Sequence, residues 1–295
     1  MTLNFEGMSI RNLNASATLT PNSAVSTNSA IGTLFGNLKV FEKSYDQFLV
    51  ESLKVDSEVF TIDFAGIEGK TTEKGGVVTT RQSLKPFVFA FKPGVADVPS
   101  LQRNYEMMKT LGFDSLTLSG SSVTTLDEKD DSISLSDGLL VLEDGFALNF
   151  EYSAEGLSDM VAKAKSLSEA SEDQDLMAIY DSLNLRDFRL TLEDNSIVER
   201  GLKLASEMTG QSETNIKLGL SAAVFFAASA AQNEVQAEVY SETVEAFAEF
   251  VKKGGKLTIE ANPPAPFALS PLITGKGEDI DPATLGFSAS HEDGK

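Results

Sequence analysis

Cysteine and tryptophan are absent from the 295-residue sequence, and histidine occurs once. Without cysteine the chain has no disulfide framework, no thiolate nucleophile, and no cysteine-ligated zinc or iron–sulfur cluster. The single histidine, His291, is the fifth residue from the end and lies in a polar stretch, so we expect it to be solvated in a mobile tail. A Ser-His-Asp triad, a histidine general base and a histidine-rich metal site are therefore not expected.

Basic residues are scarce: 24 Lys and Arg stand against 44 Asp and Glu, which gives a formal net charge of -20. Such a chain repels phosphate backbones, so we expect no binding to nucleic acid. We interpret the acidity as a well-hydrated surface rather than as a cation site. The acidic run 127–131 resembles a calcium loop, but it lacks the glycine at the sixth position and the glutamate at the twelfth. It predicts a polar hairpin tip, and we expect no metal.

Long hydrophobic runs are missing as well. The longest uncharged apolar stretch, 218–231, has 14 residues, whereas a bilayer-spanning helix needs roughly 20. This stretch therefore predicts a buried helix, and we expect no transmembrane segment in this chain. The N-terminus shows no basic region followed by an apolar run, so we expect no signal peptide in this sequence. It opens directly into strand-like sequence, as a chain does when an upstream segment has been removed, and this leaves the compartment open.

The motifs of common enzyme classes are also absent. The glycines lack the spacing of phosphate-binding or dinucleotide-binding loops, and neither Gly-x-Ser-x-Gly nor Ser-x-x-Lys occurs. We therefore expect no enzyme and no cofactor. A carboxylate-based hydrolase stays open as a third hypothesis because acids are abundant.

Capping residues and apolar periodicity predict several helices. Ser196 and Glu199 have the spacing of a capping box, and Gly210 stands where a C-terminal glycine belongs. These signals frame a helix over 196–209. The same kind of evidence predicts further helices over 101–111, 158–168, 175–180, 213–231 and 241–253.

Strand patterns are at least as common as helical ones. Phe146, Leu148, Phe150 and Tyr152 alternate with small or polar residues, which indicates a strand with one dry and one wet face. The segment 87–91 is apolar on both faces and lies between two prolines, so it predicts a short buried strand. Further strands are predicted over 53–64, 116–118, 133–135, 183–185, 188–192 and 257–259.

A weak internal repeat suggests how these elements are arranged. Residues 113–118 and 180–185 share the pattern aromatic-Asp-Ser-Leu-x-Leu, and Tyr45-Asp46 followed by Leu49 comes one period earlier. Chance similarity among common residues is the alternative to a true repeat. A repeated unit that cannot bury its own apolar face must stack on its neighbours.

We therefore predict an α+β fold, an elongated curved antiparallel sheet built from helix-plus-hairpin repeats with helices packed on one face. The predicted domain covers residues 1–260, with units near 34–100, 101–170, 175–240 and 241–270, and a Pro/Gly-rich segment and tail follow over 261–295.

Phenylalanine is abundant, with 19 residues. A sheet lined by phenylalanine and covered by helices either closes into an ordinary core or stays open as a groove for an acyl chain. The candidate lining residues of such a groove are Phe87, Phe89, Phe91, Phe146 and Phe150 on strands, and Phe225 and Phe226 on the helix 213–231.

The run Leu116-Thr117-Leu118-Ser119-Gly120, together with the aromatic-Asp-x-Leu repeat, resembles the β-rich repeats of periplasmic proteins of Gram-negative bacteria. The resemblance is to the broad neighbourhood of the AsmA-like and YdgA-like families and covers about residues 45–260. It implies an envelope location and a part in lipid transport or outer-membrane homeostasis, without catalytic residues.

The leading hypothesis from the sequence is a non-enzymatic envelope protein that presents an apolar groove to a lipid or to a partner protein. Its expected location is the periplasm, on the assumption that an upstream signal segment is missing from this chain, and a cytoplasmic location stays open. The alternative is a structural or assembly protein with a closed core and an acidic surface.

Overall fold

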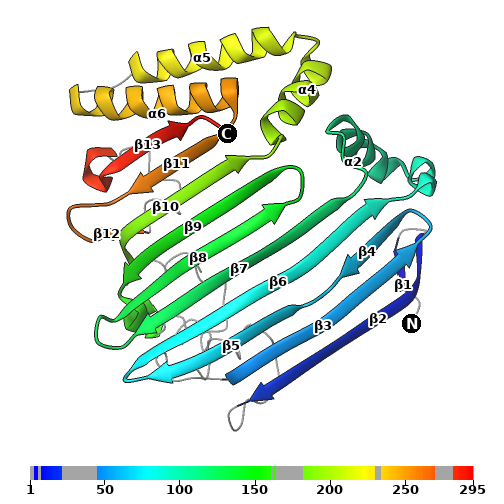
Figure 1. The fold of residues 1–295 in the computed structure, drawn as a ribbon, viewed down its shortest axis with the longest axis horizontal. Helices are drawn as coiled ribbons and strands as arrows, with labels where there is room; N and C mark the ends of the chain where they lie inside the picture. Colours follow the sequence, from blue (N-terminus) through cyan, green and yellow to red (C-terminus); the bar gives the residue numbers. More distant parts are fainter. Residues whose placement is uncertain are drawn as a thin grey trace.

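The computed structural model describes residues 3–5, 8–21, 45–160, 162–163, 182–229, 234–269 and 282–294. Its centre is one antiparallel sheet whose strand order follows the chain (Figure 1). The strands are β1 (Leu3–Phe5), β2 (Met8–Pro21), β3 (Tyr45–Ser57), β4 (Phe60–Phe64), β5 (Ile67–Lys74), β6 (Val77–Phe91), β7 (Leu116–Asp127), β8 (Ser132–Leu142), β9 (Phe146–Glu155), β10 (Asn184–Asp194), β11 (Lys256–Ala261), β12 (Phe267–Ala268) and β13 (Phe287–Glu292). The helices are α2 (Pro99–Thr110), α4 (Ile197–Thr209), α5 (Glu213–Ser229) and α6 (Glu234–Lys253), with 3-10 turns η1 (Pro93–Asp97) and η4 (Pro282–Leu285).

The sheet is open, with β1 and β2 at one edge and β13 at the other. The expected mixture of an antiparallel sheet with a few helices is confirmed. The repeat is not confirmed: Tyr45 begins β3 and Phe113 precedes β7, whereas Tyr180 lies outside the described residues. The repeat and its division into units therefore stay predictions.

The two faces of the sheet differ in character. Directly paired residues point to the same face, and the register aligns Phe64, Phe87, Leu118, Leu142 and Phe146 in one row across five strands. We call this side the apolar face. The other side, the polar face, carries rows such as Thr72, Thr79, Thr125, Ser134 and Ser153. The sheet therefore has a single side on which a core can form.

Bulges return apolar residues to that side on both halves of several strands. The register shifts between Leu84 and Phe87 in β6, between Leu135 and Gly138 in β8, and between Leu185 and Asp187 in β10. One extra residue reverses the alternation of side chains beyond it. In β6, for example, Leu84 and Phe87 both face the apolar side, although their spacing is odd.

The segment 87–91 was expected to be a short strand that begins after Pro86, and this boundary is wrong. Pro86 lies inside β6, which runs over Val77–Phe91. The proline is tolerated because it sits at the bulge, where a ladder hydrogen bond is already interrupted. The expected strand 53–64 is likewise two strands, because the Ser57 hydroxyl accepts hydrogen bonds from the amides of Val59 and Phe60 and so forms a turn.

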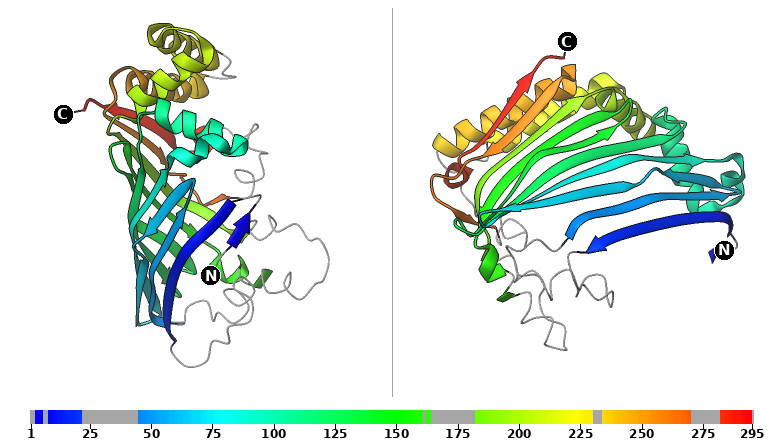
Figure 2. Two further views of the ribbon diagram at one scale, coloured as in Figure 1. Left: turned by 90° about the vertical axis from the view of Figure 1, so that its right-hand side faces the viewer. Right: turned by 60° about the horizontal axis from the view of Figure 1, so that its bottom comes forward.

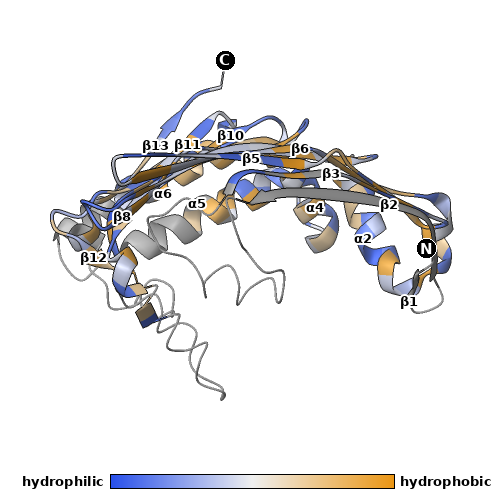
Figure 3. Cartoon of the chain, turned by 90° about the horizontal axis from the view of Figure 1, so that it is seen from below, coloured by the Kyte–Doolittle hydropathy of each residue, from blue (hydrophilic) through white to orange (hydrophobic). Residues whose placement is uncertain are grey.

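Helices α2, α4, α5 and α6 all lie on one side of the sheet, as Figures 2 and 3 show. From α2, Met108 packs with Phe113 and Leu142 on the apolar face. From α6, Ala246 and Phe250 pack with Leu257 of β11. Helices α2 and α6 thus each bury a separate patch of the sheet, and further buried residues such as Val78, Ala154 and Leu185 lie outside these two patches.

The stretch 218–231 was expected to be a buried helix, and for its first residues this is wrong. Leu218 and Leu220 of α5 are 63% and 44% exposed. Helix α5 packs mainly against α6 and α4, so it forms an outer layer over them. A helix that is apolar all round can bury only one of its sides in that position.

The predicted helix 196–209 is confirmed as α4, and Gly210 ends it with φ 69°. The expected cap is different, because the Ser196 side chain accepts no amide of the first turn. Instead, Asp194 Oδ1 accepts hydrogen bonds from the amides of Ser196, at 3.1 Å, and Val198, at 3.0 Å. Asp194 thus satisfies donors at the start of the helix.

Substitution of two glycines by alanine should change the free energy of unfolding in opposite directions, and the one in β8 tests the pairing of β8 with β9. A Cβ at Gly138 would collide with the carbonyl oxygen of Phe150, whereas a Cβ at Gly201 in α4 would meet open space. We expect Gly138→Ala to lower the free energy of unfolding by about 1–3 kcal/mol. We expect Gly201→Ala to raise it by about 0.5–1 kcal/mol because alanine is the better helix former. Urea unfolding followed by circular dichroism measures both, and a neutral Gly138→Ala would contradict the pairing of β8 with β9.

Candidate functional site

An apolar cavity of about 520 Å³ lies between α2 and the apolar face of the sheet. Its walls combine strand residues with helix residues that are far apart in the sequence. Asn104 is the only polar residue among the described residues that line it. The strands contribute Phe60, Phe89 and Phe91, and α2 contributes Leu101, Met107 and Met108.

Aromatic contacts build one wall of this cavity. The ring centroids of Phe60 and Phe89 are 6.0 Å apart, and those of Phe89 and Phe91 are 4.8 Å apart in an edge-to-face arrangement. Tyr105 of α2 continues the series, with its ring 5.8 Å from that of Phe91. Such edge-to-face pairs add to the stabilisation that burial provides. These contacts hold the rings in one continuous aromatic wall.

Arg200 ties α2 to α4 at the other end of the cavity. Its Nη1 donates to the carbonyl oxygen of Leu111 at 2.6 Å, just past the end of α2, and its Nε donates to Ser196 Oγ at 2.7 Å. The guanidinium lies over the ring of Phe113, 4.3 Å from its centroid. A cation at a helix C-terminus is favourable, so Arg200 holds α2 over the sheet.

The phenylalanines expected to line a groove fall into three groups. Phe89 and Phe91 line the cavity, and Phe146 packs against the same core patch from β9. Phe87 and Phe150 also point to the apolar face, where Phe87 pairs with Phe64 and Phe150 with Leu190, and both are half-buried. Their role in binding stays a prediction. The other two, Phe225 and Phe226, lie on α5, and their side chains are outside the described part of the structure.

The sequence reasoning missed the α2 side of the cavity. Leu101, Tyr105 and Met108 recur with a spacing of four and three in the predicted helix 101–111. That stripe is a signal for a helix face that packs against a sheet. Which strands it meets depends on the long-range fold, so the sequence pattern alone identifies only half of the cavity.

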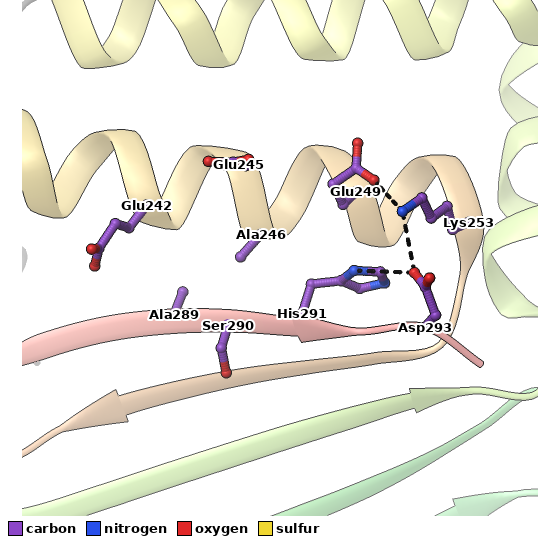
Figure 4. A pocket seen from close by; sticks show the side chains of 9 residues that line it. All are labelled: Glu242, Glu245, Ala246, Glu249, Lys253, Ala289, Ser290, His291 and Asp293. Carbon is purple, nitrogen blue, oxygen red and sulfur yellow. Dashed lines mark ion pairs between the residues drawn. The ribbon is translucent and has the colours of Figure 1, made fainter. Parts of the chain in front are cut away.

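A second, polar groove of about 630 Å³ lies between α6 and β13 (Figure 4). From α6 it is lined by Glu242, Glu245, Glu249 and Lys253, and from the end of the chain by Ser290, His291 and Asp293. Lys253 Nζ lies 2.7 Å from Glu249 Oε2 and 3.3 Å from Asp293 Oδ1. Lys253 therefore links α6 to Asp293, the residue that follows β13.

The expectation that His291 is a solvated tail residue is wrong. His291 belongs to β13, where it pairs with Leu257, and its side chain is only 8% exposed because α6 covers the strand. Its Nε2 lies 2.7 Å from the carbonyl oxygen of Gly254, and because a carbonyl oxygen only accepts, Nε2 carries a hydrogen and donates it. His291 therefore has a structural role at the end of α6. No group of three or more potential ligands in the described ranges could hold a metal ion.

The lysine–glutamate pair shifts two pKa values in opposite directions. Hydrogen bonds from Lys253 and then Lys252 lower the pKa of the Glu249 carboxyl below its ordinary value of 4.5. Hydrogen bonds to Glu249 and then Asp293 raise the pKa of Lys253 above 10.5. The contribution of Glu249 to stability is present above its ordinary pKa and is lost as the pH falls through the lowered one. The contribution of Lys253 is present below 10.5 and is lost as the pH rises through its raised pKa.

The comparison with known proteins found a match for the C-terminal half of the chain. A protein family described as "Uncharacterized protein" matches residues 139–292, which is just over half of the sequence. The chain belongs to this family. The match runs from the second half of β8 to the last residue of β13 and includes α4, α5 and α6. No curated protein matches the sequence.

No helix in the described ranges has both the length and the apolar composition needed to cross a bilayer.

The Glu249–Lys253 contact gives a prediction that NMR can check. A carbon-detected titration should place the carboxyl pKa of Glu249 below 4.5 because two lysines donate to it. In Lys253→Met the pKa should rise toward 4.5, since the larger of the two stabilising hydrogen bonds is lost. A titration that is the same in both proteins would show that Lys253 does not reach Glu249.

Proposed function

We propose that this protein is a non-enzymatic binder of an acyl chain or a similar apolar ligand. The ligand enters the cavity under α2 and extends along the apolar face of the sheet. The observation that carries the proposal is the cavity itself, because the described residues around about 520 Å³ of space are apolar apart from one, Asn104. This volume falls within the roughly 300–1,000 Å³ of small-molecule sites.

The exposure of the apolar face supports the same function. Phe64, Phe87, Phe146 and Phe150 are half-buried although they point to the side that holds the core. Among the described elements, helices α2 and α6 pack on two separate patches of this face. A ligand that lies between these patches would remove further apolar surface from water, which is favourable in proportion to the area covered.

The chemistry of the cavity argues against catalysis in it. The described residues that line it include no acid, base or hydroxyl nucleophile, whereas acid–base and nucleophilic catalysis both need such groups within hydrogen-bond reach of the substrate. The envelope location, the likeness to the AsmA-like and YdgA-like families and the repeat stay predictions. Binding of a lipid or acyl chain is compatible with all three.

A second candidate function, in assembly with other proteins, is favoured by a different observation. Met208 of α4, Leu218 of α5 and Phe247 of α6 are 66%, 63% and 38% exposed. Exposed apolar side chains on adjacent helices are typical of interaction surfaces. This candidate predicts oligomers that form with rising concentration in analytical ultracentrifugation, in the absence of any apolar ligand.

Chain-length dependence tests the leading proposal directly. Burial of one methylene contributes about 0.8 kcal/mol, so each added CH₂ should tighten binding of a saturated fatty acid about fourfold until the cavity is full. Competition against a fluorescent fatty acid measures the series. An affinity that does not vary with chain length, or no displacement at all, would contradict the proposal.

A pair of tryptophan variants locates the ligand. Leu101 lines the cavity, whereas its neighbour Gln102 is exposed and hydrogen-bonds to Glu106. Leu101→Trp should weaken binding by about tenfold, which corresponds to roughly two methylenes of lost contact, and Gln102→Trp should leave it unchanged. Because the chain has no tryptophan of its own, each indole also reports ligand arrival by its fluorescence. Equal affinity of the two variants would place the ligand elsewhere.

A further inference from the structure

The outer edge of β13 has no partner strand among the described residues. Strand β13 pairs only with β11 among the described strands, so one of its sides ends the sheet. The amide of Asn262 donates to the carbonyl oxygen of Gly286, so these two residues form a hydrogen-bonded pair. Hydrogen-bonded and non-hydrogen-bonded pairs alternate along an antiparallel ladder. The register therefore makes Ala289 and His291 non-hydrogen-bonded positions, whose N–H and C=O groups point away from β11. These groups form a short template on which another strand can pair.

The polar groove lies along this edge. The residues that line it come from α6 and the C-terminal segment 289–293, and none comes from β11, so the groove lies on the free side of β13. Figure 4 shows α6 above β13, with Glu242 and Ala246 pointing toward the strand. An added strand at β13 would therefore lie under the acidic side of α6.

The negative charge of the groove favours a positively charged partner. Four carboxylates line it, those of Glu242, Glu245, Glu249 and Asp293, against one lysine, Lys253. That lysine is already bound to Glu249 and Asp293. The whole chain carries -20, so a second copy would be repelled from this edge whereas a basic segment would be attracted.

The spacing of the acids fits a strand. Glu245 and Glu249 are four residues apart on α6, which corresponds to about 6 Å along the helix axis. Alternate residues of an extended strand, which share one face, are about 6.8 Å apart. Two basic side chains on the same face of an added strand can therefore approach these glutamates, of which Glu249 is shared with Lys252 and Lys253.

We propose that the groove between α6 and β13 binds an extended basic segment of a partner protein. The segment adds as an antiparallel strand to β13, and its alternate Lys or Arg side chains pair with the glutamates of α6. Strand addition of this kind obtains affinity from main-chain hydrogen bonds and specificity from alternate side chains. This site is separate from the apolar cavity and does not depend on the proposed acyl-chain binding.

Backbone-methylated peptides test the strand pairing. The probe is a labelled peptide of alternating lysine and threonine, and its binding to the full chain is followed by fluorescence anisotropy at low salt. In an antiparallel pair, residues directly opposite each other share a face and exchange their hydrogen bonds. Because Ala289 and His291 point toward α6, the lysines lie opposite them. N-methylation of the lysine amides should therefore weaken binding by about tenfold or more, and N-methylation of the threonine amides should not. Equal binding of the two peptides, or no binding by the unmethylated peptide, would overturn the proposal.

Charge variants test the role of α6. Glu245→Gln should weaken peptide binding by about three- to tenfold and flatten its dependence on salt. Glu199→Gln, which removes an exposed carboxylate from α4, is the matched control and should bind as the native chain does. Fatty-acid binding should be unchanged in both variants, so that a failure here is distinguishable from a failure of the proposed function. Self-association through β13, seen as dimers whose Ala289 amide is protected from exchange, would overturn the choice of partner.

Discussion

The structure depends on a one-sided sheet. Register and bulges together place Leu84 and Phe87 of β6, Leu135 and Leu140 of β8, and Leu185 and Phe188 of β10 on one face, on both sides of each bulge. Such a sheet must bury its apolar face against something. Helices α2 and α6 pack on two patches of it, and these two contacts determine where the cavity and the polar groove lie. Both candidate sites follow from how the ends of the apolar face are covered.

The two sites differ in their relation to the family. The groove between α6 and β13 lies almost wholly within the matched residues 139–292, and only Asp293 is outside. The cavity combines Leu142 and Ile197 from the matched part with α2, β4, β6 and β7 from the part before it. A strand-binding edge would therefore be a property of the family's shared half. Apolar ligand binding needs the additional strands and α2 that this chain places before residue 139.

Local signals in the sequence predicted local structure well. The bounds of α4 follow from Ser196 and Gly210, and the alternation from Phe146 to Tyr152 identifies β9. Three features could not be predicted, because each depends on contacts between distant residues. The bulge at Pro86 is defined by the pairing of β6 with Gly120 and Leu118 of β7. His291 is buried because β11 and α6 lie next to it. The cap of α4 comes from Asp194, at the end of a strand, rather than from the serine that the sequence pattern favours. The phenylalanine rows were recognised as apolar, but their common face required the register.

The central claim is that part of the apolar face stays accessible in the ligand-free protein. Hydroxyl-radical footprinting with mass spectrometry measures this for each phenylalanine, and the chain provides its own standards in Phe113, which is 7% exposed, and Phe247, which is 38% exposed. The account predicts that Phe64, Phe87 and Phe150 are oxidised at rates between those of the two standards and are protected when a fatty acid is added. Rates as low as that of Phe113 without any ligand would contradict it, because they would show a closed core.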